Sequence, residues 1–271
     1  MNNKPKVSII MGIYNCEETL SVSIDSIINQ TYENWELIMC DDSSTDNTFN
    51  IAKKYEEKYP DKIKLIRNNK NLTLAPTLNK CLKIASGKYI ARQDADDLSE
   101  HNRLERQVEF IENNIDYDLV GTNMISFDDN GKRGINRLKE KPTKNDYLRH
   151  GKVFAHATIL IKKSVLNDLG GYCEKDYVYQ AEDYELWSRF FMKNYKGINL
   201  NENLYWVRED IRAFKRRSAK RRMRGIRLNI EIYTKLNAPL YSYKNILKDI
   251  VAIFIPTKIF SFYYSKRLSR I

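Results

Sequence analysis

The sequence lacks the glycine-rich loops that cradle phosphate in many nucleotide-binding proteins. Gly12 stands alone after the first expected strand, and neither G-x-G-x-x-G nor G-x-x-x-x-G-K-[ST] occurs in the 271 residues. This absence argues against a dinucleotide-binding dehydrogenase and against a P-loop enzyme. A diphosphate bound beside this strand would have to be held by a metal ion instead of a glycine loop.

Cysteine is scarce and follows no metal-binding spacing. Cys16, Cys40, Cys81 and Cys173 stand far apart, and three of them lie in apolar patterns, so we expect buried, reduced thiols. The first residues lead directly into a strand, so no signal peptide is expected. Both features predict a cytoplasmic protein.

Long apolar runs are also missing from the basic end of the chain. The longest stretch without charge there, 250–257, is far shorter than the ~20 residues that a membrane-spanning helix needs. Residues 208–271 carry a net charge of +13, which leaves −2 for residues 1–207 of the total of +11. The basic character therefore belongs to an appendage and not to the expected catalytic region.

Apolar periodicity predicts strands that alternate with helices. The expected strands are 7–11, 37–40, 63–66, 89–91, 119–126 and 154–162, with helices between the early ones, a polar turn at 128–134 and a helix from Glu182. This alternation indicates an α/β fold whose mixed, mainly parallel sheet is flanked by helices.

Carboxylates follow two of these strands. The side chains concerned are Asp41 and Asp42 after the second strand, and Asp94, Asp96 and Asp97 after the fourth. The carboxyl ends of parallel strands meet at one edge of a sheet, where ligands bind, and like charges packed together there need a cation. We therefore expect Mn²⁺ or Mg²⁺ to bridge this edge to a diphosphate. The alternative is a solvated acidic turn that caps the next helix.

The ordered set of motifs resembles family 2 glycosyltransferases, which are inverting sugar-nucleotide enzymes of the GT-A fold. The likeness is to members that make bacterial capsule, O-antigen and exopolysaccharide. It is carried by residues 7–15, 26–32, 35–46, 85–97, 103–104, 170–172 and 182–187. It implies one GT-A domain at 1–207 and a basic, partly amphipathic helical extension at 208–271.

The resemblance also implies a donor site. Gly12, Tyr14 and Asp42 would bind the base and ribose of a nucleotide-diphosphate sugar, and Asp41 would shape the turn. Uracil is favoured because Asp42 could accept a hydrogen bond from its ring N–H. The expected reaction is the transfer of a hexosyl or N-acetylhexosaminyl group.

Asp94 and Asp96 match the D-x-D motif of the family. Asp96 would be the metal ligand, Asp94 would contact ribose or metal-bound water, and Asp97 would cap the next helix or orient its neighbours. Asp183 matches the general base, which deprotonates the acceptor hydroxyl. Glu182, beside it, could simply complement a helix dipole, which is worth about 0.3–1 kcal/mol.

Three further residues match the acceptor side of the family. His156 borders an expected apolar strand, where a histidine is more often structural than catalytic. Tyr172 and Trp187 could stack on an acceptor sugar, or they could pack in the core. The Gln-x-x-Arg-Trp motif of processive relatives is missing, since 212–218 does not match it, so we expect one sugar to be added per encounter.

The extension suggests where the acceptor lies. Residues 214–236 read as a helix rich in Lys and Arg, and 250–256 and 259–264 are apolar and aromatic. Such segments favour an anionic membrane surface, although the helix could instead pack on the catalytic domain. We expect a peripheral protein at the inner face of the cell membrane that uses a glycan or polyprenyl-diphosphate-linked acceptor.

Two other function classes stay open at this stage. A sugar-nucleotide nucleotidyltransferase also uses a metal and an α/β sheet, but it usually begins with a glycine-rich basic loop. Residues 12–15 do not supply such a loop. A nucleic-acid binder could use the basic residues 212–227, although the acidic strand ends argue against it, so no nucleic acid is expected as a partner.

Overall fold

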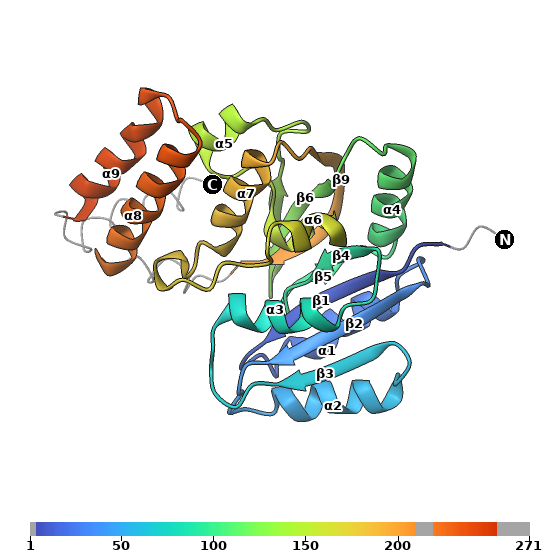
Figure 1. Ribbon diagram of the computed structural model, residues 1–271. Coiled ribbons are helices and arrows are strands. Elements are labelled where there is room, and N and C mark those ends of the chain that lie inside the picture. The colour runs from blue at the N-terminus through green and yellow to red at the C-terminus, as the bar shows by residue number, and fades with distance from the viewer. Residues whose placement is uncertain (1–3, 210–218, 254–271) are drawn as a thin grey trace.

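The computed structural model describes residues 4–209 and 219–253. A nine-stranded sheet runs through this part of the chain, and its strands follow the order β3-β2-β1-β4-β8-β6-β9-β5, with β7 beside β6 (Figure 1). The strands are β1 (Val7–Ile13), β2 (Trp35–Asp41), β3 (Ile63–Arg67), β4 (Tyr89–Arg92), β5 (Leu98–Ser99), β6 (Leu119–Asp128), β7 (Gly131–Asn136), β8 (Leu160–Lys162) and β9 (Gly197–Arg208). The predicted α/β fold is confirmed.

Helices cover both faces of this sheet. The α-helices are α1 (Leu20–Ile28), α2 (Thr48–Lys58), α3 (Leu74–Ile84), α4 (Arg103–Asn113), α5 (Lys144–His150), α6 (Lys163–Asp168), α7 (Glu182–Met192), α8 (Ala219–Lys235) and α9 (Lys244–Ile253). Short 3₁₀ segments among the described residues are η1 (His156–Thr158), η2 (Asp176–Val178) and η4 (Leu240–Tyr243).

Strands β3, β2, β1 and β4 run parallel, so their carboxyl ends share one edge. Side chains on these strands alternate between two cores, as a period of two requires. Val7, Ile9 and Met11 belong to the core beneath α1, α2 and α4. Ile10 points the other way, into the core that contains α3, α6 and α7. Both faces of β1, β2 and β4 are therefore buried, which explains their continuous apolar runs, whereas β3 exposes Lys64 and Arg67.

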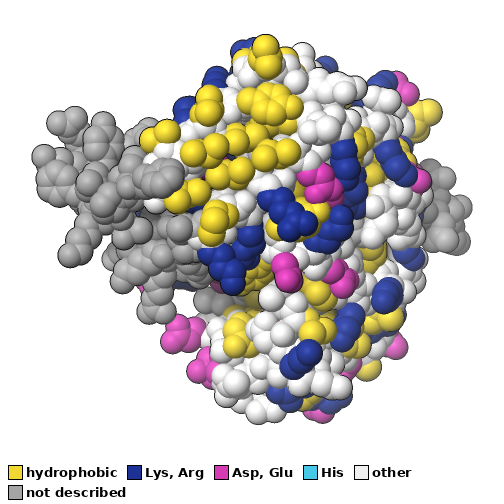
Figure 2. All heavy atoms as spheres, turned by 60° about the vertical axis from the view of Figure 1, so that its left-hand side comes forward, with side chains coloured by type: hydrophobic (Ala, Val, Ile, Leu, Met, Phe, Trp, Pro, Cys, Tyr) yellow, Lys and Arg dark blue, Asp and Glu magenta, His cyan; other side chains and the backbone are white. Residues whose placement is uncertain are grey.

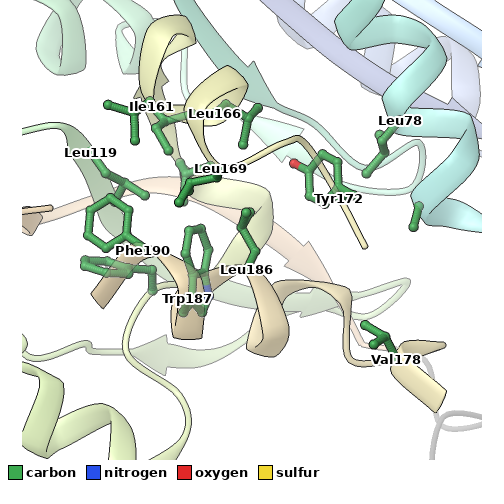
Figure 3. Packing of buried hydrophobic residues seen from close by; sticks show 14 of the residues in the cluster. Leu78, Leu119, Ile161, Leu166, Leu169, Tyr172, Val178, Leu186, Trp187 and Phe190 are labelled. Carbon is green, nitrogen blue, oxygen red and sulfur yellow. The ribbon is translucent and has the colours of Figure 1, made fainter. Parts of the chain in front are cut away.

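Figure 3 shows the centre of the second core. Leu186, Trp187 and Phe190 on α7 meet Leu119 of β6 and Leu166 of α6 there, and all five side chains are buried. Phe154 packs edge-on against Trp187, with ring centroids 5.4 Å apart. This packing fixes the position of the first turn of α7 relative to the sheet.

Two expected elements differ from the structure. The predicted strand at 154–162 is wrong for most of its length, because His156–Thr158 form η1 and only Leu160–Lys162 pair with β4 and β6. The predicted turn at 128–134 is too long, because β7 already begins at Gly131. A hydrogen bond from the Thr158 hydroxyl to the Ala155 carbonyl closes the 3₁₀ turn, a local interaction that competes with strand pairing.

The basic extension contains two helices that lie side by side at one end of the molecule (Figure 1). Helix α8 packs against α7 and η2, and it buries Leu228, Ile232 and Leu236 in the second core. The predicted helix at 214–236 is confirmed from residue 219 onward, and its first residues lie outside the described part. Helix α9 takes up residues up to Ile253, whereas the apolar segment at 259–264 lies outside the described residues. No helix in the described ranges has the length and hydropathy to cross a bilayer.

All four cysteines are free thiols, as predicted. Cys40 and Cys81 are buried between β2 and α3, whereas Cys16 and Cys173 are only half-buried. The expectation of burial is therefore confirmed for two of them.

Candidate active site

The two acidic strand ends lie at one edge of the sheet, as the sequence predicts. Ile13 at the end of β1 pairs with Asp41 at the end of β2, and β4 runs parallel on the other side of β1. The segments that follow these strands line a cleft of about 1010 Å³, here called the acidic cleft. Its lining includes Gly12, Tyr14, Asp94, Asp96 and Arg208.

A smaller hollow of about 360 Å³, here called the side hollow, adjoins the acidic cleft through Gly12 and Tyr14. Asp42, Thr73 and Glu182 complete its rim. A Cβ on Gly12 would lie 3.2 Å from the Leu74 Cδ1 atom, so glycine lets α3 approach β1 closely here.

Asp42 organises the loop that leads into α3. Its Oδ1 accepts hydrogen bonds from Asn68 Nδ2 and from the Leu72 amide, both at 2.7 Å, and its Oδ2 accepts one from the Thr73 amide at 2.9 Å. Asp41 instead shapes its own turn, because its carboxylate accepts from the Ser44 amide and pairs with Arg67.

Strained backbone gathers around the two hollows. Asn15, Ser43, Thr73 and Gln180 all have positive φ, and for the β-branched Thr73 a φ of 74° is unusual. Such strain costs about 1–3 kcal/mol per residue and concentrates where a site is held in a defined shape. The four residues flank β1, β2, α3 and α7, which are the elements that build this site.

The D-x-D segment contains a cation that the sequence reasoning missed. Arg92, the last residue of β4, is 1 % exposed, and its guanidinium pairs with Asp94 and bonds the Gln93 carbonyl. Asp94 also donates its amide to the Tyr205 hydroxyl at 3.1 Å. Asp96 is exposed, and the enclosing cleft together with Asp94 raises its pKa. A cation bound at Asp96 would relieve this repulsion.

Asp97 does not cap the next helix, and its contacts agree with the other role that the resemblance allowed, which is to orient its neighbours. Its Oδ1 accepts the Arg208 amide at 2.7 Å, which ties the D-x-D segment to β9, and Asn102 occupies the cap position of α4. Burial, followed by the charges of Asp94 and Asp96, raises the pKa of Asp97 to about 8. In the described residues no group of three or more His, Cys, Asp or Glu side chains is arranged to hold a metal ion.

Asp183 lies in the first turn of α7 and is half-buried. Burial raises its pKa, while hydrogen bonds from backbone amides and the charges of Lys152 and Arg92 oppose that rise. Glu182 precedes it and accepts the Gln180 amide at 2.9 Å. Glu182 lines the side hollow, and a carboxylate with a raised pKa next to such a hollow is suited to act as a general base.

Arg92 links the two halves of the site electrostatically. Its charge acts on Asp96 on one side and on Asp183 and His156 on the other. Burial, followed by Arg92, holds the pKa of His156 well below its usual range, so His156 is neutral. Its Nε2 lies 2.9 Å from the Tyr172 hydroxyl.

Of the three candidates for the acceptor side, Trp187 does not have a free ring face. Trp187 is fully buried between Phe154, Phe190 and His156, so of the two roles that the sequence left open it takes the one in the core (Figure 3). Tyr172 is 3 % exposed and points its hydroxyl to His156, which leaves it as a support for that residue. His156 is half-buried.

Arg92 could have been found from the sequence as a site residue, whereas Arg208 could not. Arg92 is a charged residue at the end of an otherwise apolar strand, and that exception could have marked it. Arg208 is 111 residues away from Asp97, and no local pattern connects the two. Its Nη1 also pairs with Asp129 at 2.6 Å, which closes the acidic cleft on the side of β6.

Known structures share this architecture. S. aureus TarS 1-349 in complex with UDP-GlcNAc is similar with a TM-score of 0.69 at 22 % identity, over 90 % of this chain and 72 % of that chain. The mannosyltransferase PcManGT from Pyrobaculum calidifontis, in complex with GDP-Man and Mn²⁺, is similar with a TM-score of 0.63 at 20 % identity, over 94 % and 72 %. The fold is therefore that of the GT-A glycosyltransferases.

Sequence comparison then gives the family. The profile described as "Glycosyl transferase family 2" matches residues 8–170, and the chain belongs to this family. The chain is 47 % identical to EpsE of Bacillus subtilis (strain 168) over 268 residues, which cover 99 % of this chain and 96 % of that protein. It is 33 % identical to the Escherichia coli UDP-Glc:alpha-D-GlcNAc-diphosphoundecaprenol beta-1,3-glucosyltransferase WfaP, over 72 % of this chain and 74 % of that protein. Of the function classes that the sequence left open, glycosyl transfer is the confirmed one.

Proposed function

We propose that this glycosyltransferase moves a single sugar from a nucleotide-diphosphate sugar to a hydroxyl of a glycan or lipid-linked glycan, with inversion. The observation that carries the proposal is that Asp94 and Asp96 line the acidic cleft, while Asp183 directly follows Glu182, which lines the adjoining side hollow. The charge of the buried Arg92 acts on both Asp96 and Asp183. An inverting transfer needs one base opposite the departing diphosphate and no covalent intermediate.

The donor would lie along the acidic cleft and the side hollow. Gly12 and Tyr14 line both, and Tyr14 is 48 % exposed, so its ring is available to a base. Asp42 offers its carboxylate at the rim of the side hollow, where it could accept the ring N–H of uracil. The UDP-GlcNAc named for the TarS complex and the UDP-Glc named for WfaP support a UDP-sugar as donor.

A divalent ion would be held at Asp96, beside Asp94. The residues fit such an ion, because Asp96 presents exposed carboxylate oxygens that Mn²⁺ or Mg²⁺ prefer. When bound, the ion supplies Lewis-acid stabilisation of charge on the leaving diphosphate. Arg92 holds Asp94 in place, and Asp97 anchors the segment to β9, so the ligand oxygens are positioned before the donor arrives.

The base would be Asp183, which takes the proton of the acceptor hydroxyl at its carboxylate. The amide of Tyr184 donates to its Oδ1 at 2.8 Å and orients the group. His156 would remain a neutral hydrogen-bonding group on the acceptor side. The diphosphoundecaprenol-linked acceptor named for WfaP supports a polyprenyl-diphosphate-linked acceptor for this chain.

Such an acceptor would bring the enzyme to the membrane. Leu240, Leu247, Ile250 and Val251 are exposed on η4 and α9. Figure 2 shows an apolar area with Lys and Arg side chains beside it on the face turned forward there. This combination supports peripheral attachment to an anionic bilayer at the cytoplasmic side.

The test is a pair of substitutions in purified protein. Asp183→Asn and Asp96→Asn should each lower transfer by about 10²-fold or more, but only Asp96→Asn should weaken Mn²⁺-dependent binding of UDP-sugar. Radiolabelled sugar transfer and calorimetry measure the two effects. Retained transfer in either variant would remove that residue from the mechanism, and an α-linked product from an α-linked donor would exclude inversion.

A further inference from the structure

A third hollow lies between the extension and the catalytic region. It measures about 700 Å³ and is here called the basic pocket. Lys220, Arg224 and Arg227 of α8 form one wall, and the segment with Tyr177 and Tyr179 faces them. Their spacing of four and three residues puts the three cations on one face of the helix.

Within the part of the chain that the structure describes, these cations lack acidic partners. Lys220, Arg224 and Arg227 form no ion pair within residues 4–209 and 219–253, and the buried Nε of Arg224 has no hydrogen-bond partner there. The guanidinium of Arg224 lies 5.3 Å from the ring centroid of Tyr179, and that of Arg227 lies 4.3 Å from the ring centroid of Tyr177. Ring faces orient a guanidinium but do not neutralise it.

The pocket also contains three carboxylates, and two of them are already engaged. Glu174 accepts from Asn79 Nδ2 at 2.7 Å, and Glu182 accepts from the Gln180 amide at 2.9 Å. Asp176, at the start of η2, is the third. The unpaired donors of α8 therefore make this pocket suited to a ligand with several negative oxygens.

The position of the pocket suggests which anion it receives. The basic pocket and the side hollow share Thr73, Tyr179 and Glu182, and Glu182 directly precedes the proposed base Asp183. In a lipid-linked acceptor whose first sugar receives the transfer, the diphosphate and the reacting hydroxyl are attached to the same ring. A hydroxyl placed at Asp183 would leave the diphosphate within reach of the neighbouring pocket.

We propose that the basic pocket binds the diphosphate of the lipid-linked acceptor, with Arg224 and Arg227 as the main ligands. This assignment rests on the proposed function. The donor diphosphate would lie apart from it, at Asp96 in the acidic cleft. Met223, which is 56 % exposed, lines the pocket beside the arginines and offers the lipid an apolar exit along α8.

Direct binding tests the pocket without any transfer. Farnesyl diphosphate serves as a soluble probe, in EDTA so that no metal at Asp96 captures it. By calorimetry the unmodified protein should bind it more tightly than farnesyl monophosphate. Arg224→Gln/Arg227→Gln should weaken binding by about tenfold or more, because two charge-assisted contacts are lost. The control Lys244→Gln/Lys248→Gln removes the same charge from α9 and should stay within about twofold.

Transfer assays then separate this proposal from the proposed function. In the arginine variant KM for the lipid-linked acceptor should rise about tenfold while KM for the nucleotide sugar is unchanged, and Arg224→Lys/Arg227→Lys should restore part of the loss. If the unmodified protein transferred no sugar, the proposed function would be overturned. The farnesyl diphosphate titration would still test whether the basic pocket binds a diphosphate. Equal probe binding by a folded arginine variant would overturn the pocket. The proposal for the pocket would also be overturned if the arginine variant lost binding to phosphatidylglycerol vesicles but still bound farnesyl diphosphate as the unmodified protein does. The arginines would then bind a lipid headgroup and not the diphosphate of the acceptor.

Discussion

Arg92 is a buried cation whose charge acts on the carboxylates of both halves of the site, Asp96 and Asp183. It ends β4 in a position that is fully enclosed, pairs with Asp94, and leaves its Nε without a hydrogen-bond partner among the described residues. A buried guanidinium is costly unless it is paired, so its presence here needs a compensating role. Its charge lowers the pKa of both Asp96 and Asp183 and so opposes the rise that desolvation causes in each.

Replacing Arg92 by Met should therefore change the pH dependence of the reaction. The pKa of Asp183, already raised by burial, should rise further without the cation, and a general base works only above its pKa. The acidic limb of the profile of kcat/KM against pH should move to higher pH, and Arg92→Lys should move it less. An unmoved limb in an Arg92→Met protein that melts normally would contradict this role.

At the scale of the element, β2 carries a buried charge at the edge of the sheet away from the site. Glu36 is 1 % exposed, and its Oε1 accepts from the Ser8 hydroxyl at 2.6 Å and from the Ser86 amide at 2.7 Å. Lys64 and Lys6 pair with its Oε2. Burial opposes ionisation, but these hydrogen bonds outweigh it and hold the pKa of Glu36 far below its ordinary value. The carboxylate thus joins β1, β2, β3 and the start of β4.

Glu36→Gln should destabilise the fold and make its unfolding free energy depend less on pH in the acidic range. A carboxyl group with a lowered folded-state pKa adds stability that is fully present above its unfolded pKa of about 4.3. This stability decreases below that value and is lost as the pH falls through the folded-state pKa. At pH 7 the unfolding free energy of the variant should be about 1–3 kcal/mol lower than that of the unmodified protein. Between pH 5 and 3 the unfolding free energy should fall by less in the variant than in the unmodified protein. Urea unfolding at several pH values measures both. Glu33→Gln, on the exposed approach to β2, is the control and should change neither.

At the scale of the whole molecule, charge and apolar surface are separated along the chain. The region up to residue 207 has a net charge of −2, whereas the extension is strongly basic and carries the exposed apolar side chains of α9. A bilayer with anionic lipid complements both properties of the extension, and it repels the acidic cleft weakly. This asymmetry would orient the enzyme with α8 and α9 toward the membrane (Figure 2).

Leu247→Glu/Val251→Glu should reduce binding to phosphatidylglycerol vesicles by roughly tenfold or more, since it replaces two exposed apolar groups with like charges. Co-sedimentation at low and high salt measures the effect. Val22→Glu/Ile115→Glu makes the same change at exposed positions on α1 and after α4, and it should leave binding intact. Equal losses in both variants would indicate a general charge effect and not a docking face.

Local pattern predicted most of the parallel half of the sheet correctly. The apolar runs of β1, β2 and β4 are buried on both faces, so each reads clearly as a strand, and the acidic residues after β2 and β4 had to meet at one edge. The same reasoning failed at His156–Thr158, and it left open two roles for Asp97, because the partners of His156 and Asp97 are set by tertiary contacts with Tyr172 and Arg208.

The sequence by itself determined the α/β fold, the acidic edge and the basic extension, because periodicity and composition depend only on neighbouring residues. The tertiary structure decided which of those residues act together. It turned Asp97 to β9, buried Trp187 in the core, brought the charge of Arg92 to bear on Asp183, and set the cations of α8 beside Glu182. These contacts join residues distant in the chain, and their electrostatic energies are large only where burial removes water from between the groups.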